Sequence, residues 1–168
     1  KYCIMRSTPK TILIAGYYGF KNTGDEAILA TMILDLRALL PDVHIIVVSG
    51  DPKDTEQFHG VSAVSWNEMQ GITNAMNLCD LVIMGGGGLF HDYWGFNPTT
   101  VLTPHHSGIS FYCSIALLAS ILDKPLMLYA IGVGPLLSEM GKFYTRATVE
   151  QACLVSVRDE ESREQLHS

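Results

Sequence analysis

Short apolar runs rich in β-branched residues alternate along the chain with longer segments in which apolar residues recur at helical spacing. The runs are typical of buried strands in a parallel sheet: residues 11–15, 44–49, 61–66, 80–84, 126–131 and 153–157. The helical spacing covers residues 28–40, 67–78, 109–122 and 138–151, and a charged helix is predicted to start at Glu160. Residues 51–60 are predicted to be a polar connection.

This alternation predicts repeated strand–helix–strand units. Such units build an α/β fold with a doubly wound, mostly parallel, Rossmann-like sheet, because crossovers between parallel strands are right-handed. The length of 168 residues suits about one domain of ~150 residues, so we expect residues 1–168 to form a single domain. The sequence stops soon after the last strand, and we expect it to be the amino-terminal part of a longer enzyme whose second domain lies outside it.

Composition narrows the range of partners. Hydrophobic residues make up 48% of the chain and charged residues 17%, against about 25% in typical soluble domains, which indicates an apolar globular protein. The formal net charge of −6 argues against nucleic acid or an anionic membrane surface as a general partner. The longest apolar run, residues 109–122, is shorter than the ~20 residues of a membrane span and is interpreted as a buried helix.

The cysteines and histidines give no sign of a metal site. Cys3, Cys79, Cys113 and Cys153 lie far apart without a C-x-x-C pair, and the adjacent residues 105–106 are two histidines with no obvious third ligand. We therefore expect no metal and a reduced, cytoplasmic setting. No cleavable apolar segment precedes the first strand, which agrees with that localisation.

The chemistry of such a fold lies at the carboxyl ends of its strands, where ligands bind. The turn after the first strand is glycine-punctuated, but Tyr18 stands where a G-x-G-x-x-G motif has its second glycine, and no Gly-Lys-Ser/Thr follows. Ordinary dinucleotide or ATP binding therefore loses support. The candidate substrate-binding residues in this turn are Gly16, Gly19, Lys21, Asn22, Asp25 and Glu26.

Two interpretations of the acidic residues in this turn stay open. Thr23 and Glu26 have the spacing of a capping box, and Asp25 in the first turn would compensate the helix dipole. Alternatively, the two carboxylates accept hydrogen bonds from sugar hydroxyls, since acids disfavour a phosphate at the same helix end. Asn22 either shapes the turn or hydrogen-bonds a ligand.

The fourth strand is expected to end in an exit turn of four glycines, Gly85, Gly86, Gly87 and Gly88. One interpretation is that their peptide N–H groups form an anion-binding nest that a ligand approaches closely. Gly87→Val is then expected to impair ligand binding more than folding. The alternative interpretation is a tight strand exit packed under a helix. The fifth strand is expected to exit through Gly132 and Gly134. All of these glycines are candidate substrate-binding residues.

Two further strand ends contribute polar groups. The aromatic loop 91–97 suits a surface that binds carbohydrate or a loop that closes over a ligand, or it packs against another domain. His91 and Asp92 in this loop have no Ser or Cys nucleophile motif beside them, so a hydrolase triad is not supported. Arg158 follows the sixth strand, where its guanidinium would meet an anionic ligand or pair with Asp159 or Glu161.

The strand-end motifs together resemble the polysaccharide pyruvyltransferase family. They are G-x-x-G-x-x-N-x-G-D-E-A after the first strand, D-L-V-I-M-G-G-G-G-L-F at the fourth, G-x-G-P at the fifth and S-V-R-D-E-E-S at the sixth, and the resemblance spans about residues 12–166. It implies two Rossmann-like halves similar to GT-B glycosyltransferases, of which this chain would be the amino-terminal one. The implied donor substrate is phosphoenolpyruvate, with no further cofactor. The implied acceptor is a glycan or lipid-linked sugar, pyruvylated in the cytoplasm or at the inner face of the membrane.

The resemblance also implies roles for individual residues. Arg158 matches the arginine of the family's R-D motif and would bind the anionic donor, with Lys21 second. Asn22, Asp25 and Glu26 would line the acceptor side. The family's histidine acid is expected in the carboxyl-terminal half, with His91 as a substitute catalytic residue in this chain.

Two other functions fit the same pattern. One is a GT-B-type glycosyltransferase that uses a sugar nucleotide, and the other is a non-catalytic glycan- or nucleotide-binding module. Sequence downstream of residue 168 would separate these hypotheses. A strand-end histidine with basic residues favours pyruvyl transfer, and a nucleotide-sugar-binding glutamate motif favours glycosyl transfer.

Overall fold

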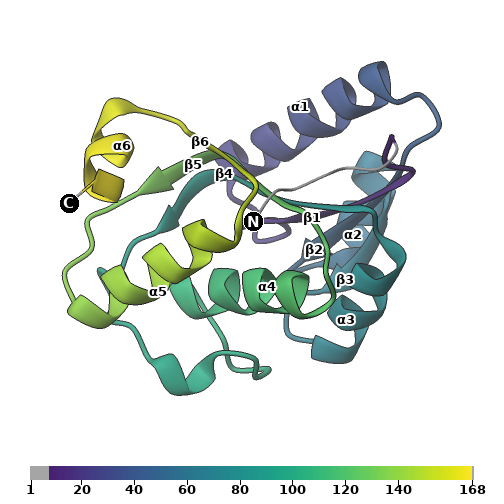
Figure 1. Cartoon of the computed structure of the whole chain (residues 1–168). Helices are drawn as coiled ribbons and strands as arrows, with labels where there is room; N and C mark the ends of the chain where they lie inside the picture. Colours follow the sequence, from purple (N-terminus) through teal and green to yellow (C-terminus); the bar gives the residue numbers. More distant parts are fainter. Residues whose placement is uncertain (1–7, 168) are drawn as a thin grey trace.

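The sheet is parallel throughout and has the Rossmann strand order. A computed structural model describes residues 8–167 (Figure 1) and contains a six-stranded sheet in the order β3-β2-β1-β4-β5-β6. The strands are β1 (Thr11–Ala15), β2 (His44–Ser49), β3 (Ser62–Ser65), β4 (Leu81–Phe90), β5 (Leu126–Val133) and β6 (Leu154–Val157). Every neighbouring pair is parallel, which confirms the predicted doubly wound α/β fold.

Helices cover both faces of the sheet. They are α1 (Thr23–Leu39), α2 (Pro52–His59), α3 (Met69–Leu78), α4 (Ile109–Ile121), α5 (Glu139–Gln151) and α6 (Glu160–His167), with a short 3-10 helix at Pro98–Thr100. Side chains of β1 alternate between the faces, so that Leu13 joins the core formed with α3 and α4, and Ile14 joins the core formed with α1. Figure 1 shows α4 and α5 side by side on one face of the sheet.

One helix was not predicted. Residues 51–60, expected to be a polar connection, contain α2, whose only buried residue is Thr55. Asp51 caps this helix by accepting a hydrogen bond from the Asp54 N–H at 3.2 Å, Pro52 follows the cap, and Gly60 ends it with φ 62°. The capping signals were present, but the apolar periodicity that identifies a helix was absent.

The glycine run belongs to a central strand, which corrects the predicted exit turn. β4 continues past Met84 to Phe90, and Gly85, Gly87 and Gly88 pair with residues of β5. Gly86 and Gly87 have φ values of 74° and 86°, a conformation that favours glycine. Gly132 likewise lies within β5 rather than after it.

Three cysteines are free thiols in the part of the chain that the structure describes, and Cys3 lies outside it. Burial raises the pKa of Cys79 to about 11. Within residues 8–167, no helix is both long enough and apolar enough to cross a membrane.

Candidate functional site

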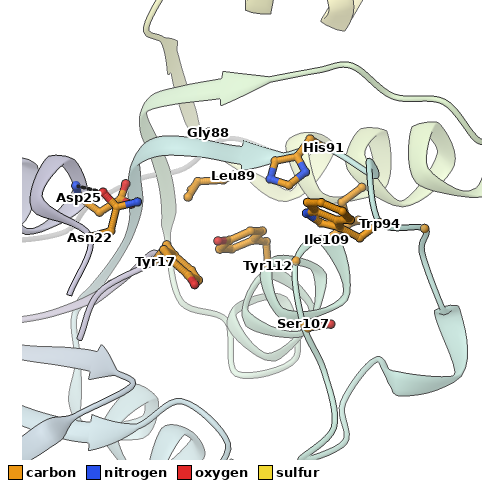
Figure 2. Close-up of a pocket in the computed structure, with 12 residues that line it drawn as sticks. Tyr17, Asn22, Asp25, Gly88, Leu89, His91, Trp94, Ser107, Ile109 and Tyr112 are labelled. Carbon is orange, nitrogen blue, oxygen red and sulfur yellow. Dashed lines mark hydrogen bonds between the residues drawn. The ribbon is translucent and has the colours of Figure 1, made fainter. Parts of the chain in front are cut away.

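A pocket of about 420 Å³ lies at the carboxyl edge of the sheet (Figure 2). It is enclosed by the turn before α1, the end of β4, the segment that leads from β4 to α4, and α4 itself. Four of the predicted site residues line it: Asn22, Asp25, Gly88 and His91. The residues that the sequence analysis did not name as site residues are Tyr17, Leu89, Trp94, Gly95, Ser107, Gly108, Ile109 and Tyr112.

The start of α1 is capped by Asn22. Its Oδ1 accepts hydrogen bonds from the N–H groups of Gly24 at 3.1 Å and Asp25 at 3.4 Å. The predicted capping box between Thr23 and Glu26 is therefore wrong. Because the cap uses Oδ1, the amide NH₂ group of Asn22 is the part of this side chain that suits a ligand oxygen.

Glu26 supports the turn before α1 and does not line the pocket. Its Oε1 accepts a hydrogen bond from the Gly19 N–H at 2.8 Å, and its Oε2 lies 3.8 Å from His59 Nε2. Gly19 itself has φ 78°, and a Cβ there would lie 2.6 Å from the backbone nitrogen of Asp51. Glu26 therefore links the turn to the end of α2, and Gly19 packs against the β2–α2 connection.

Asp25 is the acidic group of the pocket. Its exposed fraction is 9%, and burial together with the neighbouring Glu26 raises the pKa of its carboxyl, whereas the Arg158 guanidinium opposes the rise. A carboxyl with a raised pKa exchanges protons closer to neutral pH than an ordinary aspartate. Asp25 is thus the group best suited to proton transfer at this end of the pocket.

The close neighbours of the glycine run are protein atoms. A Cβ on Gly86 would overlap the Ile28 side chain, and one on Gly87 would overlap the Asp25 carboxylate. A Cβ on Gly85 would lie 2.8 Å from the Tyr129 carbonyl oxygen. Of the two interpretations, a strand packed under a helix describes these three glycines, and Gly88 alone of the four reaches the pocket.

The side chain of Tyr18 fills the space that the second glycine of a dinucleotide-binding motif leaves empty. Its fully buried side chain donates a hydrogen bond to the Gly85 carbonyl. A Cβ on Gly16 would lie 2.5 Å from Tyr18 Cε2, so the ring covers this predicted site glycine. Burial and the charges of Asp25 and Glu26 raise the pKa of Tyr18, which keeps the hydroxyl protonated as a donor.

Arg158 lies beside the pocket at its Gly88 end. Its guanidinium lies over Gly132, where a Cβ would come within 2.8 Å of Cζ. Nη1 lies 3.6 Å from the position of a Cβ on Gly88, and Nε donates to Asp159 Oδ2 at 2.7 Å. Arg158 is not among the residues that line the pocket, so the pair with Asp159 is observed and a role toward an anionic ligand stays a prediction. The two interpretations are compatible, because the pair uses Nε and does not use the Nη1 group near Gly88.

Two predicted residues lie away from the pocket. Lys21 is exposed, with φ 62°, and does not line it. Gly134 follows β5 and has φ 101°; a Cβ there would lie 2.8 Å from Gln165 Cγ. The space beside Gly134 is therefore filled by α6.

His91 lines the pocket just beyond the end of β4. Its Nδ1 is buried and has no hydrogen-bond partner among residues 8–167, and its ring centroid lies 4.9 Å from that of Tyr93. A buried polar atom without a partner is costly unless a ligand or water completes it. His91 therefore has a free hydrogen-bonding position at the site.

Asp92, the neighbour of His91, does not line the pocket. Its carboxylate accepts hydrogen bonds from the Leu137 N–H at 2.6 Å, the Ser138 N–H at 2.8 Å and Ser138 Oγ at 2.5 Å. Burial alone would raise the pKa of Asp92, but these hydrogen bonds outweigh it and lower the pKa below its usual value. Asp92 ties the aromatic loop to the start of α5.

We expect Asp92→Asn to destabilise the protein by about 1–3 kcal/mol at neutral pH, because an amide cannot accept all three hydrogen bonds. The native pKa lies below the unfolded value of about 3.9, so the carboxylate's contribution is complete above that pH and is lost as the pH falls through the native pKa. Urea unfolding of both proteins should give a stability difference that narrows on acidification. Equal stability at neutral pH would contradict this role.

Tyr112 is a pocket residue that the sequence analysis did not name. Tyr112 belongs to the apolar helix and was interpreted only as core; burial, with the nearby Asp25 and Tyr17, raises its pKa and keeps its phenol protonated.

His106 is fully buried, and its Nε2 hydrogen-bonds the Trp66 carbonyl at 2.6 Å. Among residues 8–167, no three His, Cys, Asp or Glu side chains form a group that could hold a metal ion.

Comparison with known proteins decides the family. The sequence model of the polysaccharide pyruvyl transferase family matches residues 22–168. The chain belongs to this family. No curated protein matches the chain. Among solved structures, a wide-type short-chain dehydrogenase/reductase from Veillonella parvula DSM 2008 in complex with NADP has a TM-score of 0.41 and 15% sequence identity, over 72% of this chain and 47% of that one. The chain thus spans less than half the length of that structure.

The polysaccharide pyruvyl transferase match includes most of the polar residues around the pocket. It begins at Asn22 and extends past Arg158, so Asp25, the glycine run and His91 all lie within it. The turn that contains Tyr17 lies just before the matched residues. The resemblance identified from the strand-end motifs is confirmed.

Proposed function

We propose that this chain forms the amino-terminal half of an enzyme that transfers pyruvate from phosphoenolpyruvate to a cell-surface polysaccharide precursor as a ketal. The observation that carries the proposal is the family match over residues 22–168. The polar groups of the pocket support it, because the carboxyl edge of a parallel sheet is where such folds bind ligands. A second Rossmann-like half, as in GT-B enzymes, would complete the cleft. The reaction would take place in the cytoplasm or at the inner membrane face, where lipid-linked acceptors are accessible.

The reaction places defined demands on the site. A proton adds to the methylene carbon of phosphoenolpyruvate, a sugar hydroxyl attacks the resulting cationic carbon, inorganic phosphate leaves, and a second hydroxyl closes the ketal. The donor has a carboxylate and a phosphate, so it needs a charge-assisted partner. We propose Arg158 for this role, because its Nη1 lies 3.6 Å from the position of a Cβ on Gly88, a residue that lines the pocket.

The acceptor hydroxyls need a base. We propose that Asp25 takes a proton from an attacking hydroxyl, since its raised pKa matches this task and it lines the pocket with Asn22. We propose that His91, whose Nδ1 has no hydrogen-bond partner in the described part of the chain, hydrogen-bonds the phosphate leaving group or supplies the proton.

Asp25→Asn is expected to lower pyruvyl transfer and to raise the melting temperature. A raised native pKa means that, above the unfolded pKa of about 3.9, ionisation of Asp25 opposes folding, and an amide removes that cost. Calorimetry and initial rates on the same preparations test both effects. Asp35→Asn on the exposed side of α1 is the control and should change neither. A lower melting temperature for Asp25→Asn would contradict this account.

Activity of the full-length protein tests the function. Incubation with phosphoenolpyruvate and a panel of free and lipid-linked saccharides should release phosphate only in the presence of an acceptor and yield an acid-labile pyruvate ketal by mass spectrometry. The isolated chain of 168 residues should give no turnover. Consumption of a sugar nucleotide in place of phosphoenolpyruvate would favour glycosyl transfer.

A further inference from the structure

A continuous series of aromatic rings connects the pocket with the interior of the protein. Tyr17 and Phe20 stack with their ring centroids 4.4 Å apart and their planes 13° apart. Phe20 contacts Trp66 edge-on at 5.5 Å, and Trp66 contacts the buried His106 at 5.6 Å. A ring supported in this way has little freedom to turn, which suits a fixed binding surface.

Tyr17 is the member of this series that reaches the pocket. It is 45% exposed although one face of its ring lies against Phe20, so the opposite face is available to a ligand. Figure 2 shows the ring between the Asn22–Asp25 pair and Tyr112. Gly50 leaves room for the Phe20 ring that supports Tyr17, because a Cβ on Gly50 would lie 2.7 Å from Phe20 Cε1.

We propose that Tyr17 is the stacking platform for the acceptor pyranose, an inference that rests on the proposed function. The C–H bonds on one face of a pyranose form an apolar patch that packs on an aromatic ring, and the hydroxyls around the edge remain available for hydrogen bonds. Asn22 and Asp25 lie at the same wall of the pocket and suit those hydroxyls. Phosphoenolpyruvate does not suit this position, because the face of an aromatic ring is electrostatically negative and the donor is an anion.

The proposal divides the pocket into two parts. The donor would lie near Gly88 and the Arg158 guanidinium, and the acceptor would lie on the Tyr17 ring; the Asp25 carboxyl is close to Gly87. Loss of the Tyr17 ring should therefore weaken acceptor binding and leave donor binding unchanged. A purely structural role for Tyr17 would alter both, or would alter stability.

Steady-state kinetics of the full-length enzyme test this division, with phosphoenolpyruvate and methyl β-galactopyranoside, methyl β-glucopyranoside or methyl α-mannopyranoside as acceptor probes. We expect Tyr17→Ala to raise the KM of the acceptor by about tenfold or more with the KM of phosphoenolpyruvate within about twofold, and Tyr17→Phe to behave as the wild type. Phe143→Ala is the matched control, because Phe143 is 63% exposed on α5 and lines a different hollow.

The outcomes separate this inference from the function on which it rests. An unchanged acceptor KM in Tyr17→Ala, with an active wild type, would overturn the stacking platform alone. A wild type that pyruvylates the polysaccharide precursors but none of the three methyl glycosides would also overturn it, because a stacking platform for a single pyranose should accept at least one of them. A wild type that transfers pyruvate to no saccharide would overturn the proposed function. Saturation-transfer NMR with the same glycosides then tests the platform without turnover, and equal signals from wild type and Tyr17→Ala would refute it.

Discussion

Arg158→Ala in the full-length enzyme is expected to reduce kcat/KM for phosphoenolpyruvate by on the order of 2–4 kcal/mol of transition-state stabilisation. Arg158→Lys should be nearly as damaging, because an ammonium cannot reproduce two parallel hydrogen bonds from a planar guanidinium. The physical reason is the geometry at the sheet edge, where Gly132 leaves room for the guanidinium and Nη1 lies toward Gly88. Folding should be almost unaffected, because the ion pair of Arg158 with Asp159 is half-exposed and is worth about 0–1 kcal/mol.

Steady-state rates with phosphoenolpyruvate varied, together with melting curves, test this expectation. Arg146→Ala is a matched control, since Arg146 forms a comparable exposed ion pair with Glu150 on α5, away from the pocket. The control should retain full activity. Normal turnover by Arg158→Ala would mean that the donor binds elsewhere.

Gly86→Ala is expected to destabilise the protein by about 2–4 kcal/mol, the sum of overpacking and a strained backbone. The added Cβ would overlap Ile28 in the core beneath α1, and φ is 74°. Gly87→Val would also be strained, because φ at Gly87 is 86°, and its side chain would displace the Asp25 carboxylate that lines the pocket. The expectation that this variant impairs ligand binding more than folding stays a prediction.

Gly95→Ala separates overpacking from backbone strain in the loss of stability expected for Gly86→Ala. Gly95 has φ 85°, but a Cβ there would meet nothing within 4 Å, so its replacement should cost only about 1 kcal/mol. Urea unfolding of both variants gives the comparison. Equal losses in Gly86→Ala and Gly95→Ala would show that packing under α1 contributes nothing.

The sheet could be predicted from the sequence because its strands contain short apolar runs, and the runs of β1, β2 and β4 are buried on both faces. The same reasoning failed where the structure depends on contacts between distant segments. Nothing in the run of four glycines shows that β5 pairs with it, and therefore β4 was predicted to end at Met84 rather than at Phe90. α2 escaped because its capping residues lie in a segment without an apolar face.

In the candidate site too, some features follow from the sequence pattern and others depend on contacts between distant segments. Its position at the carboxyl edge and the presence there of Asn22, Asp25 and His91 follow from topology and motif. Side-chain direction does not: Glu26, the neighbour of Asp25, turns toward the Gly19 backbone. Tyr112 could not be predicted as a site residue, because a tyrosine in an apolar helix has the same sequence pattern whether it faces the core or a pocket.

Titration of the isotope-labelled chain with phosphoenolpyruvate, followed by NMR of the backbone amides, tests most directly whether this pocket binds the donor. The account predicts that the largest shifts cluster at Gly88, Leu89, His91 and Arg158. It also predicts that Arg158→Ala abolishes them. The largest shifts in the hollow between α5 and α6, or no shifts at all, would contradict the account.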